Sequence, residues 1–323
     1  MKIIFIFIDG FGIGEKKDTN PLFLNKLFYL SHFNDEFQQN NIKKISSNII
    51  VIPLDATLDI PGIPQSATGQ ASLFTGKNVS KIIGEHKFGF PNKEIRKILI
   101  NSNILLDLKN TGFKTKFINV YPYFADELSS GILTLTENGE FQLKNKNELI
   151  NRALRRISVT TVMALTTKQS FYNINDLKNR ESIYQDFTNK LLIKKNIGVE
   201  EFTPEEAGKI LLKNTEHYDF ILYEYFLTDK AGHKQDSREA INILESLNRF
   251  ITYIIENKSE NTLIVITSDH GNIEDLSIKT HTYNKVPCII SDDFKNFVEP
   301  DNINSLTDVY DLIVKTLSNK SDL

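Results

Sequence analysis

Near its amino terminus the chain reads Ile3-Ile4-Phe5-Ile6-Phe7-Ile8-Asp9-Gly10. Six consecutive apolar residues, four of them β-branched, end at an acid and a glycine. A strand that is buried on both faces has this uninterrupted apolar pattern, and such strands are typical of parallel sheets. We therefore expect a buried parallel strand with Asp9 at its carboxyl end.

Three later apolar runs also lie beside acids or histidines. They are residues 220–226 before Asp229, residues 262–267 before Asp269-His270, and residues 286–290 after His281. Helical patterns separate them, at residues 204–214 behind the capping residue Thr203 and at residues 238–257. Strands that alternate with helices predict an α/β domain, with a mostly parallel sheet flanked by helices.

The middle of the chain has a different character. Residues 91–209 are richer in Asn, Lys and Ser, and their apolar runs are shorter. We expect a smaller α+β cap inserted here, with strands near 113–120 and 131–135 and a helix at 182–194. The catalytic core would then consist of residues 1–90 plus 210–323.

Composition limits the class of protein. Of 323 residues, 40% are hydrophobic and 24% charged, which suits a soluble globular protein. A formal charge of -3 gives no basic surplus for nucleic acid.

The single cysteine, Cys288, suits a reducing cytoplasm, and we expect it to be a buried strand residue. The first apolar run is too short for a spanning helix, which needs roughly 20 residues, and it has no cleavage site for export. We expect a cytoplasmic protein without a membrane or nucleic-acid partner.

The acids and histidines beside the apolar runs are candidate metal ligands. In open α/β sheets functional residues gather beyond the carboxyl ends of the strands. Taken singly, an Asp at a strand end is more often a turn or cap residue, and a lone His is more often a surface or core residue. Their joint arrangement favours a metal site. A mixture of carboxylates and imidazoles suits zinc or manganese better than calcium. The candidates are Asp9, Asp229, His233, Asp269, His270 and His281.

A dinucleotide site is the competing interpretation of the first loop, Gly10-Phe11-Gly12-Ile13-Gly14. Its spacing is G-x-G-x-G where the dinucleotide fingerprint has G-x-G-x-x-G. The acid also precedes the glycines, where the fingerprint has none. We set this interpretation aside.

A candidate nucleophile lies in the segment Pro64-Gln65-Ser66-Ala67-Thr68-Gly69-Gln70. A hydroxyl at the start of a helix faces free backbone N–H groups and the positive end of the helix dipole, which suits phosphate. Ser66 is otherwise simply an N-cap. With two divalent ions nearby, a serine hydroxyl can ionise near neutral pH and attack phosphorus.

Together these motifs resemble the alkaline phosphatase superfamily, in particular the metalloenzyme branch with cofactor-independent phosphoglycerate mutase and phosphopentomutase. The motifs cover about the first 90 and the last 115 residues, and similar bacterial metalloenzyme-domain proteins extend the resemblance through the cap. The resemblance implies two divalent ions, manganese or zinc. It assigns one ion to Asp9, Ser66, Asp269 and His270, and the other to Asp229, His233 and His281. It makes Ser66 the phosphorylated nucleophile, with Thr68 as the fallback.

The substrate is less well defined, because the chain departs from the mutase pattern. Gln70 stands where both mutases have histidine, and the chain is shorter than the glycerate mutase. Arginine binds phosphate through paired donors, so we consider the arginines of the cap, although each can equally lie on a solvated helix face. His86, at the junction of core and cap, either lines the site or packs a hinge. The arginine candidates are Arg152, Arg155, Arg156 and Arg180.

Three functions remain open from the sequence. The leading hypothesis is a phosphatase or phosphomutase that acts on a small phosphorylated metabolite through a phosphoserine. The second is a phosphodiester or sulfate ester hydrolase of the same superfamily, although Ser66 lacks the sequence that follows a sulfatase nucleophile. The third is a non-catalytic metal- or nucleotide-binding module, which would not require the serine.

Overall fold

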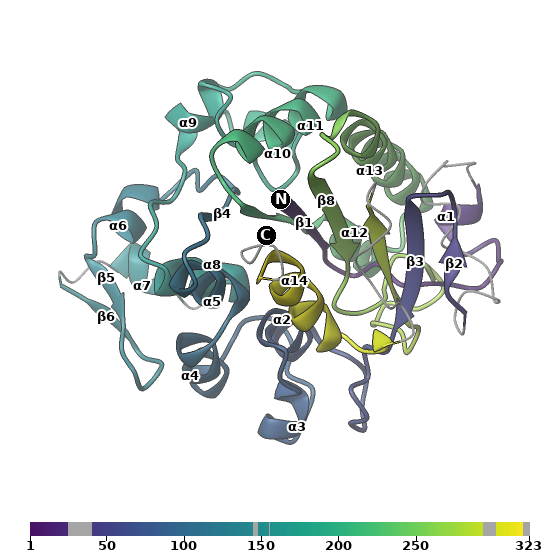
Figure 1. The fold of residues 1–323 in the computed structure, drawn as a ribbon, viewed down its shortest axis with the longest axis horizontal. Coiled ribbons are helices and arrows are strands. Elements are labelled where there is room, and N and C mark those ends of the chain that lie inside the picture. Colours follow the sequence, from purple (N-terminus) through teal and green to yellow (C-terminus); the bar gives the residue numbers. More distant parts are fainter. Residues whose placement is uncertain (25–40, 145–147, 155, 293–301, 319–323) are drawn as a thin grey trace.

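The structure is a computed structural model that describes residues 1–24, 41–144, 148–154, 156–292 and 302–318. Its centre is a seven-stranded sheet with the strand order β2-β3-β9-β8-β1-β7-β4 (Figure 1). The strands are β1 (Lys2–Ile8), β2 (Lys43–Lys44), β3 (Ile49–Leu54), β4 (Thr115–Phe117), β7 (Phe220–Tyr225), β8 (Thr262–Thr267) and β9 (Val286–Ser291).

The first apolar run forms the predicted buried strand. β1 pairs in parallel with both β7 and β8, so it lies inside the sheet. Its side chains alternate between two hydrophobic clusters, with Phe5 and Phe7 on one face and Ile6 and Ile8 on the other. Only β9 and β2 run against this direction, since β9 is antiparallel to β8 and β3, and β2 is antiparallel to β3. The mostly parallel α/β sheet predicted from the sequence is confirmed.

Helices cover both faces of this sheet (Figure 1). One face packs against α2 (Ser66–Thr75), α4 (Lys93–Asn101), α5 (Ile104–Asn110), α8 (Val159–Thr166) and α14 (Asp308–Ser318). The other packs against α11 (Pro204–Lys213), α12 (Leu227–Lys234) and α13 (Ser237–Asn257). The predicted helices 204–214 and 238–257 correspond to α11 and α13, and Thr203 forms the capping box expected for α11. Shorter helices are α1 (Pro21–Leu24), α3 (Val79–Ile83), α6 (Ala125–Ser129), α7 (Glu148–Leu154), α9 (Ile174–Lys178), α10 (Lys190–Lys194) and the 3-10 turn Asn214–Glu216.

One strand of the predicted cap belongs to the main sheet. Residues 1–90 and 210–323 supply every strand of the main sheet except β4, which lies within 91–209 and pairs in parallel with β7. The expectation that residues 113–120 form a strand of the insertion is therefore wrong. This strand contributes Phe117 to the hydrophobic core that covers one face of the main sheet. Residues 131–135 do form a separate hairpin, β5 (Leu133–Leu135) with β6 (Phe141–Leu143), at the far left of Figure 1. The domain boundaries themselves remain predictions.

The helix expected at residues 182–194 is confirmed only at its end, as α10. The buried carboxylate of Asp186 accepts hydrogen bonds from the backbone N–H groups of Asn189 (2.9 Å) and Leu191 (2.7 Å). Phe187 and Asn189 have positive φ angles. A side chain that binds the local backbone in this way competes with helix formation, which explains the irregular segment before α10.

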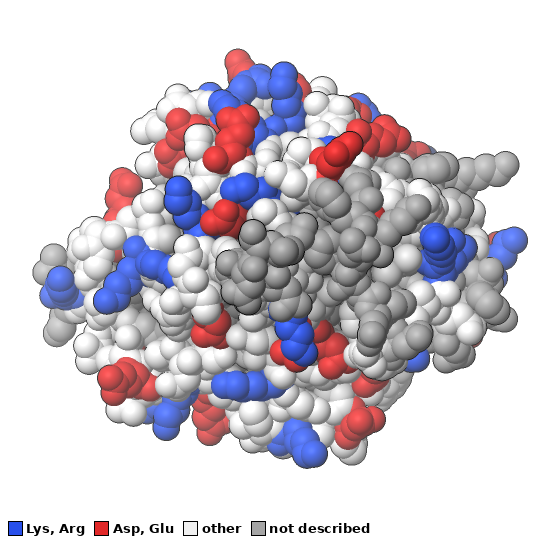
Figure 2. All heavy atoms as spheres, viewed as in Figure 1, with Lys and Arg blue, Asp and Glu red and all other residues white. Residues whose placement is uncertain are grey.

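The surface carries charges of both signs. In the face shown in Figure 2, Lys and Arg side chains are interspersed with Asp and Glu among the described residues. None of the described helices combines the length and the apolar character that crossing a bilayer requires. Cys288 is buried in β9, as expected from the sequence. The cytoplasmic location and the absence of a nucleic-acid partner stay predictions.

Candidate metal centre

The candidate ligands meet at one edge of the sheet. Asp9 directly follows β1, and Asp269 and His270 follow β8. Asp229 and His233 lie one turn apart on α12, which begins two residues after β7. Because β1, β7 and β8 are parallel neighbours, their carboxyl ends share this edge. The further contributions are His281, from the loop between β8 and β9, and Ser66, the first residue of α2.

Asp9, Asp269 and His270 form the first cluster and are all buried. His270 Nε2 lies 3.3 Å from Asp9 Oδ1 and 3.5 Å from Asp269 Oδ2. Ser66 Oγ lies 3.0 Å from the same nitrogen. These are the four residues that the sequence assigned to the first ion.

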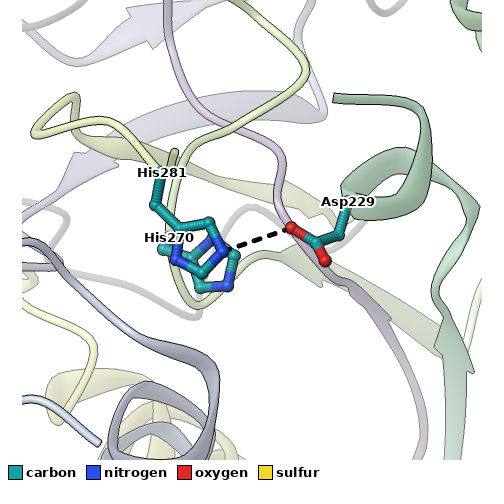
Figure 3. Close-up of side chains that lie close together, drawn as sticks. All are labelled: Asp229, His270 and His281. Atoms are coloured by element: carbon teal, nitrogen blue, oxygen red, sulfur yellow. Dashed lines mark ion pairs between the residues drawn. The ribbon is translucent and has the colours of Figure 1, made fainter. Parts of the chain in front are cut away.

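Asp229, His233 and His281 form the second cluster. The Asp229 carboxylate reaches both imidazoles, with Oδ1 at 3.4 Å from His281 Nε2 and Oδ2 at 3.4 Å from His233 Nε2. Figure 3 shows this carboxylate pointing at His281, whose ring stacks on that of His270 with centroids 3.6 Å apart. The two clusters are therefore in contact through the stacked rings.

The second-cluster histidines use Nδ1 on backbone carbonyls, which leaves their Nε2 atoms facing each other. His281 Nδ1 donates to the carbonyl of Pro64 (2.9 Å), and His233 Nδ1 donates to that of Lys279 (2.7 Å). In the neutral rings each Nε2 then carries a lone pair, yet these two atoms lie only 3.3 Å apart. A shared cation removes this repulsion, and a backbone bond at Nδ1 is the usual orientation of a metal-binding histidine.

The spacing of the candidate ligand atoms also suits a bound metal. The ligand atoms of Asp9, Asp269 and His270 lie within 4.8 Å of one another, and so do those of Asp229, His270 and His281. The buried Asp9 Oδ1 has no hydrogen-bond partner among the described residues. The donor set of carboxylates and imidazoles therefore fits a divalent metal, and the number of ions stays a prediction. His270 belongs to both groups, so the division of ligands between the ions remains a prediction.

Electrostatics in the centre depend on burial and on neighbouring charges. Burial, opposed by the charge of His270 and reinforced by the charges of Asp9 and Asp229, raises the pKa of Asp269 to about 7. Burial and the charge of Asp229 likewise raise the pKa of Asp9. Burial would raise the pKa of Asp229 too, but in the metal-free protein hydrogen bonds from His233 and His281, when these rings are protonated at Nε2, outweigh it and lower that pKa. Three carboxylates so close together favour a bound cation.

Close backbone contact also shapes the centre. Gly10 has a φ of +70°, and a Cβ atom at this position would lie 2.8 Å from the Cα of Asp229. Only glycine accommodates both the left-handed conformation and the contact. Asn272 Nδ2 donates to Asp229 Oδ1 (2.7 Å) and fixes this carboxylate from the other side. Gly10 therefore lets the loop after β1 pack against the first turn of α12.

Glu274 is a functional residue that the sequence analysis missed. Its buried Oε2 accepts hydrogen bonds from the backbone N–H groups of Gly12 (3.0 Å) and Asn272 (2.7 Å). Its Oε1 accepts from the Thr282 hydroxyl and from Asn284 Nδ2 (3.1 Å). One carboxylate thus joins the loops that carry Asp9, His270 and His281. Its place four residues after His270 was the available signal.

Glu224 is a second missed residue. It is buried at the end of β7 and accepts a hydrogen bond from the Thr160 hydroxyl, whereas its Oε1 has no partner among the described residues. Burial, opposed by that hydrogen bond and reinforced by the charges of Asp9 and Asp269, raises its pKa well above the usual range. An acid within the otherwise apolar run 220–226 was the signal.

The predicted substrate residues lie at different places. Arg156 lines a cavity of about 520 Å³ that also contains Asp9, Ser66 and Asp229 in its wall. Arg152 is exposed on α7 outside the lining of this cavity, and Arg155 lies outside the described residues. Arg180 forms ion pairs with Glu200 and Glu206. These roles stay predictions, and Lys230 is a further cation of the cavity wall that was not anticipated.

His86 and Thr68 are occupied by local contacts. The His86 ring nitrogens lie 3.2 Å from Ser80 Oγ and 3.2 Å from the carbonyl of Ile60. Thr68 is buried, and its hydroxyl accepts a hydrogen bond from the backbone N–H of Lys87 (3.1 Å). Neither residue contributes to the cavity lining, in contrast to Ser66.

Comparison with known proteins identifies relatives of this chain. The family model described as the Metalloenzyme superfamily matches residues 1–320. A 2,3-bisphosphoglycerate-independent phosphoglycerate mutase of Pyrococcus abyssi is 31% identical over 107 residues, which are 29% of this chain and 26% of that protein. A protein of the same name from Wolinella succinogenes is 32% identical over 94 residues, 27% of this chain and 19% of the relative. The matches thus span about a quarter or less of these relatives.

A solved structure with a similar fold confirms the fold class. A phosphoglycerate mutase of Leishmania mexicana, determined at low cobalt concentration, aligns with a TM-score of 0.51 and 10% identity over 98% of this chain and 95% of that one. An alkaline phosphatase from the Antarctic bacterium TAB5 aligns with a TM-score of 0.48 and 13% identity over 98% of each chain.

Proposed function

The chain belongs to the Metalloenzyme superfamily, and from this premise we propose that it catalyses two-metal phosphoryl transfer on a phosphorylated small molecule through a phosphoserine at Ser66. The observation that carries the proposal is the position of the Ser66 hydroxyl, 3.0 Å from His270 Nε2 beside the acid cluster. A site that only bound metal would have no need of this hydroxyl.

The proposed ion sites use the two clusters, with manganese or zinc as the ions. Asp9, Ser66, Asp269 and His270 would hold one, and Asp229, His233 and His281 the other. Two divalent ions, when bound, lower the pKa of a serine hydroxyl and stabilise negative charge on phosphate oxygens.

Ser66 performs the transfer steps. Its hydroxyl proton leaves to solvent, Oγ bonds to phosphorus, and the bond from phosphorus to the alcohol oxygen breaks, so that the alcohol departs with a proton from water. A water molecule or an acceptor hydroxyl then attacks the phosphoserine, which releases phosphate or a new ester and restores the serine. The dipole of α2 favours the phosphate charge at this position. The expected free N–H groups are not available, because those of Ala67 and Thr68 donate to the carbonyl of Lys87 (3.1 and 3.3 Å).

Arg156 and Lys230 are the proposed cations for the substrate phosphate, because both line the cavity that contains Ser66. Gln70 Nε2 donates to Asp269 Oδ2 (3.1 Å) and is proposed to orient this ligand. It would do so where the mutases that the chain resembles have a histidine.

The test loads the metal-free protein with manganese or zinc and supplies phosphate monoesters, a phosphodiester and a sulfate ester. We expect phosphate release from monoesters and a mass increase of one phosphoryl group on the peptide that contains Ser66. Turnover of the diester or sulfate ester alone would replace the proposal by the alternative hydrolase. Metal binding without any turnover or phosphopeptide would make the chain a binding module.

A further inference from the structure

The cavity beside the metal centre is larger than a phosphate requires. Its volume is about 520 Å³, and Asp9, Ser66 and Asp229 occupy only part of its wall. The remainder comes mainly from the loop after β4, from α6 to α8, from the end of β7, and from the loop residues 89–90 and 184–185. Whatever the phosphate carries must lie against this second part.

Apolar side chains, including several aromatic rings, make up most of that second part. Two of them are well exposed at the protein surface, Phe90 at 46% and Tyr123 at 54%. Exposed aromatic rings that wall a cavity are typical of ligand-contacting positions. The aromatic residues of the lining include Phe90, Tyr121, Tyr123, Phe124, Tyr184 and Phe226.

Most polar groups of the same wall are already paired within the protein. The Tyr121 hydroxyl bonds to that of Thr161. Asn119 uses its amide on the backbone N–H (3.0 Å) and carbonyl (2.8 Å) of Glu224. Gln185 Nε2 donates to the Tyr184 hydroxyl (3.1 Å). Outside the metal centre, Glu224 Oε1 is the buried side-chain polar atom of the described wall that has no partner. Arg156 and Lys230 suit the phosphate.

From this lining we infer that the preferred substrates are phosphate monoesters whose alcohol bears a bulky apolar group of aryl size. The inference rests on the proposed function, since the metal centre fixes the phosphate end. A glycerate or a sugar would bring several hydroxyl or carboxyl groups against a wall whose buried side-chain polar groups are mostly paired, and each unpaired buried polar group costs binding energy. An aryl group instead displaces water from the aromatic side chains of the wall and packs against their ring faces, which favours binding.

Binding of non-hydrolysable phosphonates tests this preference directly. Calorimetry on the manganese-loaded protein would compare 2-phenylethylphosphonate with ethylphosphonate, which share the anionic head. We expect the phenyl compound to bind about 10- to 100-fold more tightly, as burial of one aromatic group implies. Equal affinities, or tighter binding of the ethyl compound, would overturn the inference.

Variants of the two exposed aromatic residues at the rim of the cavity, Phe90 and Tyr123, test which part of the wall gives the preference for the phenyl compound. Phe90→Ser and Tyr123→Ser should each reduce the ratio of affinities at least about threefold, because each removes a ring face from the wall. Phe88→Ser is the matched control: Phe88 is 76% exposed, lies two residues from Phe90 and is outside the cavity lining, so the ratio should stay unchanged. A preference that survives both rim variants would contradict the inference.

Turnover separates this inference from the proposed function. Hydrolysis of 2-phenylethyl phosphate and glycerol phosphate with equal kcat/KM would leave the function standing and overturn the apolar preference. Tight, Phe90-dependent binding of the phenyl phosphonate without hydrolysis of any ester would uphold the preference and overturn the function.

Discussion

Ser66 Oγ lies 3.0 Å from His270 Nε2, and the residue that bears the hydroxyl is the first of α2. The N-cap of this helix is Gln65, whose side chain makes no capping hydrogen bond. The serine is therefore not the capping residue, which was the simpler interpretation of its place in the sequence. Its hydroxyl is directed to the acid and histidine cluster.

We predict that Ser66→Ala lowers kcat at least about a thousandfold and abolishes the phosphopeptide, because it removes the hydroxyl that lies beside His270 Nε2. Manganese content should persist at half or more, since the carboxylates and imidazoles remain. Activity against a phosphate monoester and metal content by mass spectrometry are the measurements. Thr68→Ala is the control, and full activity of Ser66→Ala with loss in Thr68→Ala would transfer the nucleophile to Thr68.

Metal binding should strengthen with pH. In the metal-free protein the pKa of Asp269 is raised to about 7 by burial, against about 3.9 in an unfolded chain. The native protein therefore binds more protons than the unfolded one between these values, and its stability falls as pH rises toward 7. A metal needs the charged carboxylate and displaces this proton, so its affinity rises over the same interval.

The measurement is the Tm with chelator and with manganese at pH 6, 7 and 8. The increase in Tm caused by manganese should grow with pH, and Asp269→Asn should remove most of that growth. An increase in Tm that is constant from pH 6 to pH 8 would show that the raised pKa of Asp269 does not control binding.

Glu274→Gln should lower the free energy of unfolding by about 2–3 kcal/mol, because the new amide NH₂ faces donors such as the N–H of Gly12 and loses an acceptor. Urea unfolding of the metal-free protein measures this change. The exposed Glu256→Gln on α13 is the control, with an expected effect within about 0.5 kcal/mol. Equal effects in the two variants would mean that Glu274 does not join the loops.

Sequence patterns predicted the parts of the fold that depend on local periodicity. The strand at 3–8 was recognisable because burial on both faces leaves a continuous apolar run. The helix at 238–257 was recognisable because burial along one side leaves apolar residues at a helical spacing. The segment 182–189 was not, because its backbone follows hydrogen bonds to Asp186. The membership of β4 in the main sheet depends on long-range pairing with β7, which no local pattern contains.

The same distinction holds for the site. Asp9, Asp229 and Asp269 were candidates because strand ends share an edge, and the structure brings them together with three histidines. Glu274 and Glu224 were missed because their roles depend on which loops and helices surround them. The sequence also could not separate the cap arginines, since Arg156 and Arg152 differ only in where their side chains lie relative to the cavity.

This difference between the two arginines gives the last prediction. Arg156 lines the cavity that contains Ser66, whereas Arg152, four residues earlier and also exposed, is outside its lining. A guanidinium that binds the substrate phosphate contributes about 1.5–3 kcal/mol, so Arg156→Ala should raise KM at least about tenfold with little change in kcat. Arg152→Ala removes the same charge from the same stretch of chain and should leave KM within about twofold. If both variants raise KM equally, the effect comes from net charge near the cavity and Arg156 does not contact the phosphate; a loss confined to Arg152→Ala would place the substrate on the other side of α7.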